Sequence, residues 1–517
     1  MRKTVALIIL DGFGIGRKDA TNPIHAAHPE MLGYLKKNFL YGSLQASGIS
    51  VGLPWGEEGN SEVGHITIGA GKVIYQHYPR ISLTIKNKEF FKNKELKKAF
   101  DYAKEKNSSL HFVGVLTSGN VHASFEHLEA LFEFTKLENT QKLYIHIITD
   151  GRDSPPKSAR ELLGKLEGLI KKYGRGKIGS ISGRYYAMDR DEHYDRTELA
   201  YSAMIGLAPV PATANEWLEK NYSENLTDEF VRPVTLDPEG RIKENDAVIF
   251  FNYREDSIRQ LAKSFAQKDF DRFPINHFNN LFIVSFTDYA PKLGVAIAFP
   301  QEIVQQPLGK ILEDAGRIQL RIAETEKYAH ITYFFNGLRD APFQNEYRIL
   351  IPSQNLARHD EHPEMRAREI ADRIIQGLSE GGSDFILANF ANPDVIGHTG
   401  NFEAAIKTIG VIDGEIRRIF DATMKYDATL IITSDHGNVE EMANPQTGAI
   451  ETKHDSNPVP IHIIGHEFIS LKNARDIESS ESETSGVLSD IAPTILELLG
   501  IPATSEMTGI SLLKSLK

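Results

Sequence analysis

The feature that most constrains the fold is a buried-strand pattern near both ends of the chain. Uninterrupted apolar runs ending in a polar turn occur at "TVALIILDG" (4–12), "DFILANFANPD" (384–394) and "ATLIITSDHGN" (428–438). Such runs are typical of strands buried on both faces of a sheet. Helical patterns precede the two later runs, at 364–378 and 404–424. This alternation predicts an α/β fold, a parallel sheet with helices on both faces.

The middle of the chain repeats the pattern with its own runs. They are "LHFVGVLTSG" (110–119), "LYIHIITDGRD" (143–153), "AVIFFNYR" (247–254) and "LFIVSFTDY" (281–289). A chain of 517 residues is too long for one core. We therefore predict a second α/β domain, residues 77–302, inserted into a discontinuous first domain of residues 1–76 and 303–517. The serine- and acid-rich segment 476–486 is expected to be a solvated loop.

Composition and charge exclude several classes of protein. The net charge of −12 argues against nucleic-acid binding, which needs a basic patch. The absence of cysteine excludes disulfides, thiol catalysis and zinc sites built on thiolates. No apolar segment approaches the ~20 residues that span a bilayer, and Asp11 and Gly12 interrupt the first run before it reaches the length of a signal-peptide core. We expect a soluble, cytoplasmic protein that contacts neither nucleic acid nor membrane.

Acidic and imidazole side chains follow the predicted strands of the first domain. A single Asp or His is more often a helix cap or a hydrogen-bonded core residue, but several at separate strand ends favour a ligand site. Asp394 and His398 are four residues apart, which places them on one face of a helical turn. Carboxylate and imidazole together suit Mn²⁺, Zn²⁺, Co²⁺ or Fe²⁺ better than Ca²⁺, and two adjacent metals are a common device in phosphoryl chemistry. The candidate ligands are Asp11, Asp394, His398, Asp435, His436 and His454.

The glycine-rich stretch "EEGNSEVGHITIGAGK" (57–72) holds a candidate nucleophile. It is not a G-x-S-x-G elbow, because Glu62 and Val63 separate Ser61 from Gly64. It is not a Walker A loop either, because Val73 follows where serine or threonine is required. Taken alone, a structural turn explains the stretch as well as a catalytic one. A serine hydroxyl needs activation, and a nearby metal can supply it, so Ser61 is linked to the candidate metal ligands.

Arginines occur in polar turns of the middle region. Guanidinium groups bind carboxylate and phosphate through paired hydrogen bonds, although most single arginines are solvated surface residues. Their positions at strand ends of one domain favour an anion pocket, in which His122 is a phosphate contact or a proton carrier. The arginines are Arg152 in "DGRDSPP", Arg184 and Arg190 in "SGRYYAMDRD", and Arg254 in "FFNYREDS".

Six motifs in order resemble the cofactor-independent phosphoglycerate mutases of the alkaline phosphatase superfamily. They are "GNSEVGH", "DGRDSPP", "SGRYYAMDRD", "AETEKYAHITYFFNG", "ANPDVIGHTG" and "TSDHGN", and the resemblance runs from Leu10 to "DIAPTILELLGIPATSEMTG" near the C-terminus. It implies an alkaline-phosphatase-like metal domain with an inserted phosphotransferase domain. It also implies a monomeric enzyme of glycolysis and gluconeogenesis that interconverts 2- and 3-phosphoglycerate without 2,3-bisphosphoglycerate, through a phosphoserine on Ser61.

The resemblance also implies roles for individual residues. One Mn²⁺ would be held by Asp394, His398 and His454, and a second by Asp11, Ser61, Asp435 and His436. Lys327 would act in catalysis by neutralising the transferred phosphoryl group. The substrate contacts would be His122, Arg152, Asp153, Arg184, Arg190, Arg254 and Lys327.

The sequence departs from the family pattern at a few positions. Ser257 stands where the family usually has a second arginine, three positions after Arg254, and Arg259 is a candidate to compensate. Asn120 replaces a usual glycine, and Ser434 precedes the Asp-His pair. Ser257 keeps open one alternative to the mutase, a metal-dependent phosphatase or phosphopentomutase-like enzyme of the same superfamily. A second alternative is a catalytically inactive relative that binds an anion or a metal.

Overall fold

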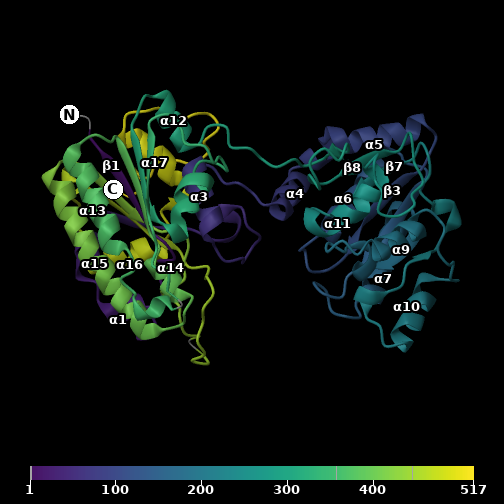
Figure 1. Cartoon of the computed structure of the whole chain (residues 1–517), viewed down its shortest axis with the longest axis horizontal. Helices are drawn as coiled ribbons and strands as arrows, with labels where there is room; N and C mark the ends of the chain where they lie inside the picture. The colour runs from purple at the N-terminus through teal and green to yellow at the C-terminus, as the bar shows by residue number, and fades with distance from the viewer. Residues whose placement is uncertain (1–2, 357, 445, 517) are drawn as a thin grey trace. The chain divides into compact units, whose positions relative to one another are not determined.

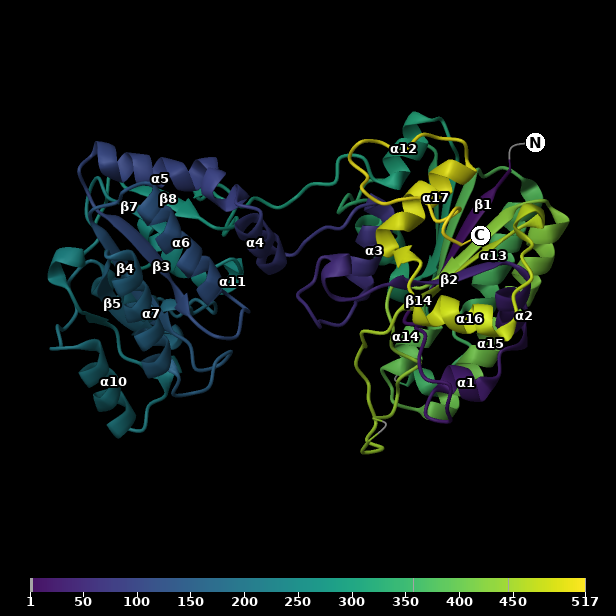
Figure 2. The same ribbon diagram turned by 180° about the vertical axis from the view of Figure 1, so that it is seen from behind.

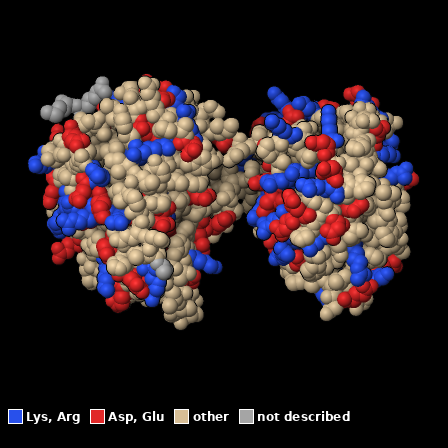
Figure 3. All heavy atoms as spheres, in the orientation of Figure 1, with Lys and Arg blue, Asp and Glu red and all other residues tan. Residues whose placement is uncertain are grey.

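The computed structural model describes residues 3–356, 358–444 and 446–516. The chain forms two compact units, one of Met1–Gln76 with Glu302–Lys517 and one of His77–Gln301. We call them the discontinuous unit and the inserted unit. Figure 1 colours the chain by residue number, so both segments of the discontinuous unit can be followed. On the face that Figure 3 shows, acidic and basic side chains are interspersed over each unit.

The discontinuous unit is built on an eight-stranded sheet among the described residues, in the order β11-β10-β12-β1-β13-β14-β2-β15. β1 lies between β12 and β13 and is parallel to both, whereas β14 is antiparallel to β13 and to β2. The strands are β1 (Val5–Leu10), β2 (Leu40–Gln45), β10 (Gln319–Glu324), β11 (Glu346–Ile351), β12 (Phe385–Phe390), β13 (Thr429–Thr433), β14 (Val459–Ile464) and β15 (Gly486–Val487).

Helices bury both faces of this sheet. Ala6 and Ile8 of β1 share a core with α2, α13 and α15, while Leu7 and Ile9 pack with α3, α12 and α17 on the other face. Figure 2 shows α2 and α16 close to β14 and β2, and α1 at the end of α15. The helices are α1 (Pro23–Ala27), α2 (Glu30–Asn38), α3 (Ser61–Ala70), α12 (Leu308–Asp314), α13 (Ala367–Glu380), α14 (Asn392–Gly397), α15 (Phe402–Lys425), α16 (Ala474–Ser482) and α17 (Ile491–Leu498).

The inserted unit has a seven-stranded sheet among its described residues, in the order β6-β5-β4-β3-β7-β8-β9. All neighbouring strands are parallel except β5 and β6. The strands are β3 (Leu110–Leu116), β4 (Leu143–Thr149), β5 (Lys177–Gly183), β6 (Val234–Thr235), β7 (Ala247–Phe250), β8 (Phe282–Ser285) and β9 (Ala296–Ile297). The helices are α4 (His77–Lys86), α5 (Lys94–Glu105), α6 (Phe125–Leu137), α7 (Ala159–Tyr173), α8 (Arg184–Ala187), α9 (Tyr194–Met204), α10 (Ala214–Ser223) and α11 (Glu255–Ala266).

The α/β fold expected from the buried runs is confirmed in both units. One expectation is wrong: most of the segment 476–486 is helical rather than a loop, because α16 spans Ala474–Ser482. Asn473 caps this helix through a capping box with Asp476, and Glu481 is tied to Lys36 and Tyr41. Within the described residues, no helix has the length and apolar character needed to cross a membrane.

Candidate active site

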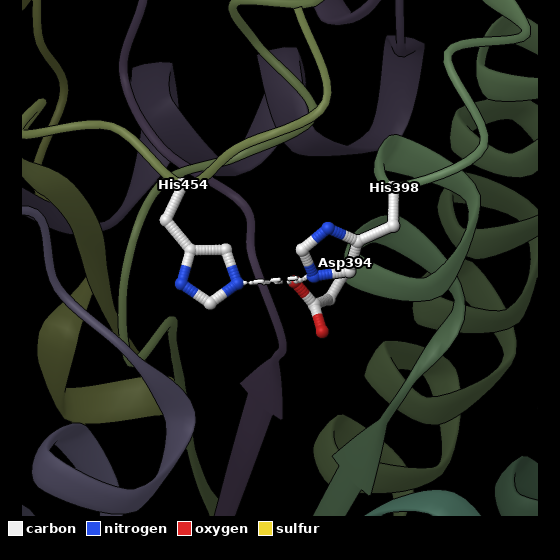
Figure 4. Close-up of side chains that lie close together, drawn as sticks. All are labelled: Asp394, His398 and His454. Atoms are coloured by element: carbon white, nitrogen blue, oxygen red, sulfur yellow. Dashed lines mark hydrogen bonds and ion pairs between the residues drawn. The ribbon is translucent and has the colours of Figure 1, made fainter. Parts of the chain in front are cut away.

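Three predicted ligand residues converge at the carboxyl edge of the first sheet. Asp394 lies in α14 directly after β12, His398 follows α14, and His454 comes from the segment before β14. Asp394 Oδ1 is 3.3 Å from His398 Nε2 and 3.2 Å from His454 Nε2. The two Nε2 atoms are 3.1 Å apart. Figure 4 shows these side chains pointing toward one another from separate segments.

The hydrogen bonds behind the two imidazoles test whether this group fits a metal. His398 Nδ1 lies 2.8 Å from the carbonyl oxygen of Thr452, and His454 Nδ1 lies 2.8 Å from that of Gly59. A carbonyl only accepts hydrogen bonds, so each Nδ1 carries the proton in the neutral ring. Both Nε2 lone pairs then face the same point beside a carboxylate oxygen. That arrangement is the one that histidine ligands adopt around a metal, so the residues fit.

A second group lies beside the first and contains Asp11, Asp435 and His436. Their ligand atoms lie within 4.8 Å of one another, and all three side chains are fully buried. Asp11 follows β1, and Asp435 and His436 follow β13, so parallel pairing of these strands brings the three together. His436 Nε2 is 2.9 Å from Ser61 Oγ and 3.5 Å from Asp11 Oδ1.

Lys327 joins the two groups. Its Nζ donates to Asp11 Oδ1 at 2.6 Å, to Asp394 Oδ2 at 2.6 Å and to Ser61 Oγ at 2.7 Å. Burial opposes its charge, but the carboxylates of Asp11 and Asp394 hold the pKa of Lys327 well above its usual range. The side chain is therefore a buried ammonium.

The electrostatics of this edge favour cations. Three buried carboxylates, those of Asp11, Asp394 and Asp435, face one ammonium. Burial opposes a charged imidazole, yet Asp435, Asp11 and Asp394 raise the pKa of His436 to about 10. A site that stabilises a proton this strongly also stabilises a metal ion, and carboxylate with imidazole is a donor set for divalent transition metals.

Ser61 sits at the N-terminus of α3, where the glycine-rich stretch turns into a helix. Asn60 is the N-cap, and its side chain accepts a hydrogen bond from Val63 N. The partial positive charge of a helix N-terminus favours negative charge on Ser61 Oγ. Gly64 lets α3 pack closely against the segment that follows β13. A Cβ at this position would lie only 2.6 Å from the Asp435 carbonyl oxygen, so a larger residue would not fit.

Two buried residues that no sequence pattern assigned to the site support the candidate metal ligands. His65 Nδ1 donates to the Ser61 carbonyl oxygen at 2.8 Å and lies 3.1 Å from Asp435 Oδ2. Asn389 Nδ2 donates to Asp11 Oδ2 at 2.7 Å and lies 3.1 Å from His65 Nε2. Asn389 is a polar residue inside the apolar run "FILANF" of β12. This interruption of the run is the sequence signal from which its role could have been suspected.

The inserted unit contains a separate polar cavity of about 360 Å³. Its lining residues follow the ends of β3, β4, β5 and β7, the edge at which parallel α/β sheets bind ligands. The structure thus brings together all the residues of this unit that were predicted to contact the substrate. They are His122, Arg152, Asp153, Arg184, Arg190 and Arg254.

Carboxylates hold the arginines of this cavity in place. Arg184 donates to Asp153 Oδ2 at 2.7 Å, and Arg190 donates to Asp256 Oδ2 at 3.0 Å. Arg184 Nη2 also lies 3.0 Å from His122 Nε2. Burial and the Arg184 charge lower the pKa of His122, so the imidazole is neutral and its Nε2 accepts from Arg184. These contacts order the cationic groups before any anion binds.

Comparison with known proteins identifies the family. Residues 81–291 match the family described as "BPG-independent PGAM N-terminus (iPGM_N)". The 2,3-bisphosphoglycerate-independent phosphoglycerate mutase of Clostridium botulinum is 44% identical, and the alignment covers 99% of this chain and 100% of that protein. The chain belongs to this family. The corresponding mutase 1 of Methanosarcina barkeri is 43% identical over 99% of this chain and 98% of that protein.

A solved structure of the family is also similar. The Leishmania mexicana phosphoglycerate mutase, crystallised at low cobalt concentration, aligns with a TM-score of 0.53 and 27% identity. The alignment covers 99% of this chain and 97% of the Leishmania chain. The likeness therefore extends over both units of the phosphoglycerate mutase fold.

The departures from the phosphoglycerate mutase pattern have local structural consequences. Ser257 lines the cavity but bonds only to Asp256 Oδ1 among the described contacts, through its backbone N and its Oγ. Arg259 does not line the cavity, because its Nε donates to the Tyr289 carbonyl oxygen at 2.6 Å. Arg196, which the sequence analysis missed, does line it, bonded to Asp189 and stacked on Tyr185.

The other two departures are compatible with the site. Asn120 has φ +52°, a left-handed conformation that asparagine tolerates better than most residues. Ser434 Oγ accepts from Phe13 N at 2.9 Å and donates to the His436 carbonyl oxygen at 2.8 Å. This serine joins the segment after β1 to the segment after β13, the two that carry Asp11 and Asp435.

Proposed function

We propose that the chain interconverts 2- and 3-phosphoglycerate without 2,3-bisphosphoglycerate, as an isomerase of glycolysis and gluconeogenesis. The observation that carries the proposal is the position of Ser61 Oγ, which lies 2.7 Å from the Lys327 ammonium and 2.9 Å from His436 Nε2. The Lys327 ammonium on one side and a metal ion held by His436 on the other would both lower the pKa of the Ser61 hydroxyl, and a deprotonated hydroxyl is the form that attacks a phosphoryl group. The family names of the relatives point to the same reaction.

The two units would divide the work. The discontinuous domain, residues 1–76 and 303–517, would bind metal and carry Ser61. The inserted domain, residues 77–302, would hold the substrate through its arginine-lined cavity. The cavity supports this division, because four predicted guanidinium groups and a neutral imidazole converge there.

Two divalent ions, Mn²⁺ in our proposal, would occupy the two ligand groups. Asp394, His398 and His454 would hold one, and Asp11, Ser61, Asp435 and His436 the other. When bound, such ions lower the pKa of a coordinated hydroxyl and neutralise charge on a transferring phosphoryl group. The paired Nε2 atoms of His398 and His454 are the main support for this part of the proposal.

The residues of the chain would then act as follows. Ser61 Oγ attacks the phosphorus in line and becomes phosphoserine, the bond from phosphorus to the glycerate oxygen breaks, and the proton of the Ser61 hydroxyl ends on that oxygen. The Lys327 ammonium neutralises the transferring oxygens. Arg152, Arg184, Arg190 and Arg254 bind the carboxylate and the phosphate through paired hydrogen bonds. The released glycerate stays on these arginines, reorients with Asp153 and His122 against its hydroxyls, and takes the phosphoryl group back on its other oxygen.

Retention of glycerate separates this mutase from a phosphatase. Water that reached the phosphoserine would release inorganic phosphate, so the enzyme must exclude water while glycerate reorients. The ion-paired arginines support retention because they are ordered in advance.

We further propose that the protein acts as a monomer in the cytoplasm. Size-exclusion chromatography with light scattering tests the oligomeric state, and cell fractionation tests the location.

An enolase-coupled assay tests the proposal. The protein is supplied with 3-phosphoglycerate and Mn²⁺, with no bisphosphoglycerate, and is compared with the same protein after complete removal of metal by a chelator. We expect 2-phosphoglycerate to form only with metal. Activity that survives complete removal of metal contradicts the proposed metal role. Formation of inorganic phosphate in place of 2-phosphoglycerate identifies the phosphatase alternative. Absence of turnover both with Mn²⁺ and after removal of metal identifies an inactive relative.

A further inference from the structure

A second cavity lies in the discontinuous unit, apart from the candidate ligand groups. Its volume is about 360 Å³, within the range of small-molecule sites. It lies between the segment after β1, helices α1 and α2, and strands β13 and β14. Residues that define its wall include Leu10, Phe13, Leu32, Gly33, Ile432 and His462. None of them belongs to the ligand groups or to the arginine cavity.

The interior of this cavity is largely apolar and open beside α2. Leu10, Phe13 and Leu32 are buried in the core between the sheet and α2, and Ile15 and Ile24 line the cavity as half-buried side chains. Gly33 lies within α2, and a Cβ built there would meet no heavy atom within 4 Å. A side chain at this position would therefore meet open space, and because Gly33 lines the cavity, a large side chain there would occupy part of it.

Cationic side chains surround the cavity. Arg17, Lys18 and Lys36 all line it, together with one carboxylate, that of Glu481. Lys18 Nζ and Lys36 Nζ are each 2.8 Å from an oxygen of Glu481. Arg17 pairs with Glu441 at 3.3 Å, so the three cations of the lining face two carboxylates and exceed them by one charge, in a chain whose net charge is −12. A ligand with an anionic group complements this excess.

His462 is a buried polar residue in the wall of the cavity. The side chain is 1% exposed, and burial lowers its pKa to about 3, so the imidazole is neutral. Its Nδ1 has no hydrogen-bond partner among the described residues. A buried polar atom without a partner carries a desolvation cost that a ligand atom can remove.

We propose that this cavity binds a small aromatic acid, a flat apolar ring system with a single carboxylate or sulfonate. The rings lie against Phe13, Ile15 and Ile24, the anion lies at Lys18, and a polar ring substituent lies toward His462. The proposal goes beyond the mutase reaction, because phosphoglycerate has no apolar body that would fill this volume.

Binding of the fluorescent acid 8-anilinonaphthalene-1-sulfonate tests the site in the full chain. Saturating 3-phosphoglycerate is present so that the arginine cavity is blocked. The Gly33→Leu variant fills the cavity and improves helix propensity, and Gly410→Leu is the matched control on an exposed position of α15 with equally open surroundings. We expect the wild type and the control to bind the probe, and Gly33→Leu to bind it about tenfold more weakly or worse. Equal binding by Gly33→Leu, or no binding by the wild type, overturns the proposal.

A second comparison tests the class of ligand. N-phenyl-1-naphthylamine has the same rings without the sulfonate. We expect the wild type to prefer the sulfonate by about tenfold, and Lys18→Gln to reduce this preference. If the neutral probe binds as tightly as the acid, or if Lys18→Gln leaves the preference unchanged, the cavity does not select an anion and the proposed ligand class is wrong.

Discussion

The Nε2 atoms of His398 and His454 face each other at a distance of 3.1 Å. Each ring donates its Nδ1 proton to a backbone carbonyl, that of Thr452 or that of Gly59. Neither Nε2 can then donate to the other while both rings are neutral, and their lone pairs repel. A cation between them removes this repulsion, whether a metal ion or a proton, and the hydrogen bond to Asp394 raises the pKa of His398 in the metal-free protein.

His454→Ala is expected to weaken Mn²⁺ binding at the group that contains Asp394. Loss of an outer hydrogen-bonding partner costs roughly 10–100-fold in metal affinity, and loss of a ligand should cost more. Isothermal titration of the metal-free protein with Mn²⁺ measures the change. His277→Ala, at an exposed histidine of the inserted unit, is the control. Unchanged Mn²⁺ affinity in His454→Ala would contradict the assignment.

Lys327→Met is expected to destabilise the metal-free protein. The substitution leaves the buried carboxylates of Asp11 and Asp394 without their ammonium, and breaking a buried ion pair costs about 3–5 kcal/mol. Added Mn²⁺ should restore part of the loss. Urea unfolding in chelator and in Mn²⁺ measures both effects. Lys310→Met is the control, because its partners Glu313 and Asp314 lie with it on the surface, where an ion pair contributes little to stability. Equal losses in the two variants would refute the role of Lys327.

Gly64→Ala is expected to displace the start of α3. The new Cβ would lie 2.6 Å from the Asp435 carbonyl oxygen, a backbone atom that cannot move aside cheaply. Overpacking of this kind costs about 1–3 kcal/mol, and the shift should also lower turnover by moving Ser61. Thermal unfolding and the coupled assay measure the two effects. Gly410→Ala should instead stabilise the protein by up to about 1 kcal/mol, since its helix position is open. A fully active, stable Gly64→Ala variant would argue against close packing here.

Stability should fall on mild acidification because of buried neutral histidines. Burial lowers the pKa of His127 to about 3, against 6.5 in the unfolded chain. Between these values the unfolded state binds more protons, so the contribution of His127 is complete above pH 6.5 and is lost as the pH falls toward 3. At 1.36 kcal/mol per pH unit, the loss from pH 7.5 to 5 is about 2 kcal/mol.

The His127→Gln variant isolates this contribution. Glutamine cannot take up the proton but can still bond to Ser82, whose Oγ lies 3.0 Å from His127 Nε2. The free energy of unfolding, measured by denaturant titration at each pH, should fall less steeply in the variant by about 2 kcal/mol over this range. Identical pH dependence in the two proteins would show that His127 is not buried in its neutral form.

The central strands were predictable because they are buried on both faces. β1, β12 and β13 read as uninterrupted apolar runs, and the acids after them met at one edge because the strands are parallel. The antiparallel strands β2 and β14 gave no such signal, since "LYGSLQ" and "VPIHII" contain polar residues or proline. Helix α16 was missed because composition does not reveal the capping box of Asn473 or the contacts of Glu481.

The site was only partly predictable because several of its residues are brought together by contacts between segments that are distant in the sequence. The supporting roles of His65 and Asn389 depend on contacts between segments 324 residues apart, which no local pattern encodes. Arg259 was a reasonable candidate for the missing arginine by sequence distance, yet its position on α11 directs it to Tyr289. Arg196 lines the cavity from α9, and it could be found only once the sheet had placed α9 beside the strand ends.

The central claim is that Ser61 carries the phosphoryl group, and the coupled assay of Ser61→Ala tests it most directly. The variant and the wild type are compared in saturating Mn²⁺, each with and without added 2,3-bisphosphoglycerate. We predict that the wild type forms 2-phosphoglycerate at the same rate in both conditions and that Ser61→Ala forms none in either, while its fold is retained by circular dichroism. Turnover by Ser61→Ala at a rate close to that of the wild type would contradict the account.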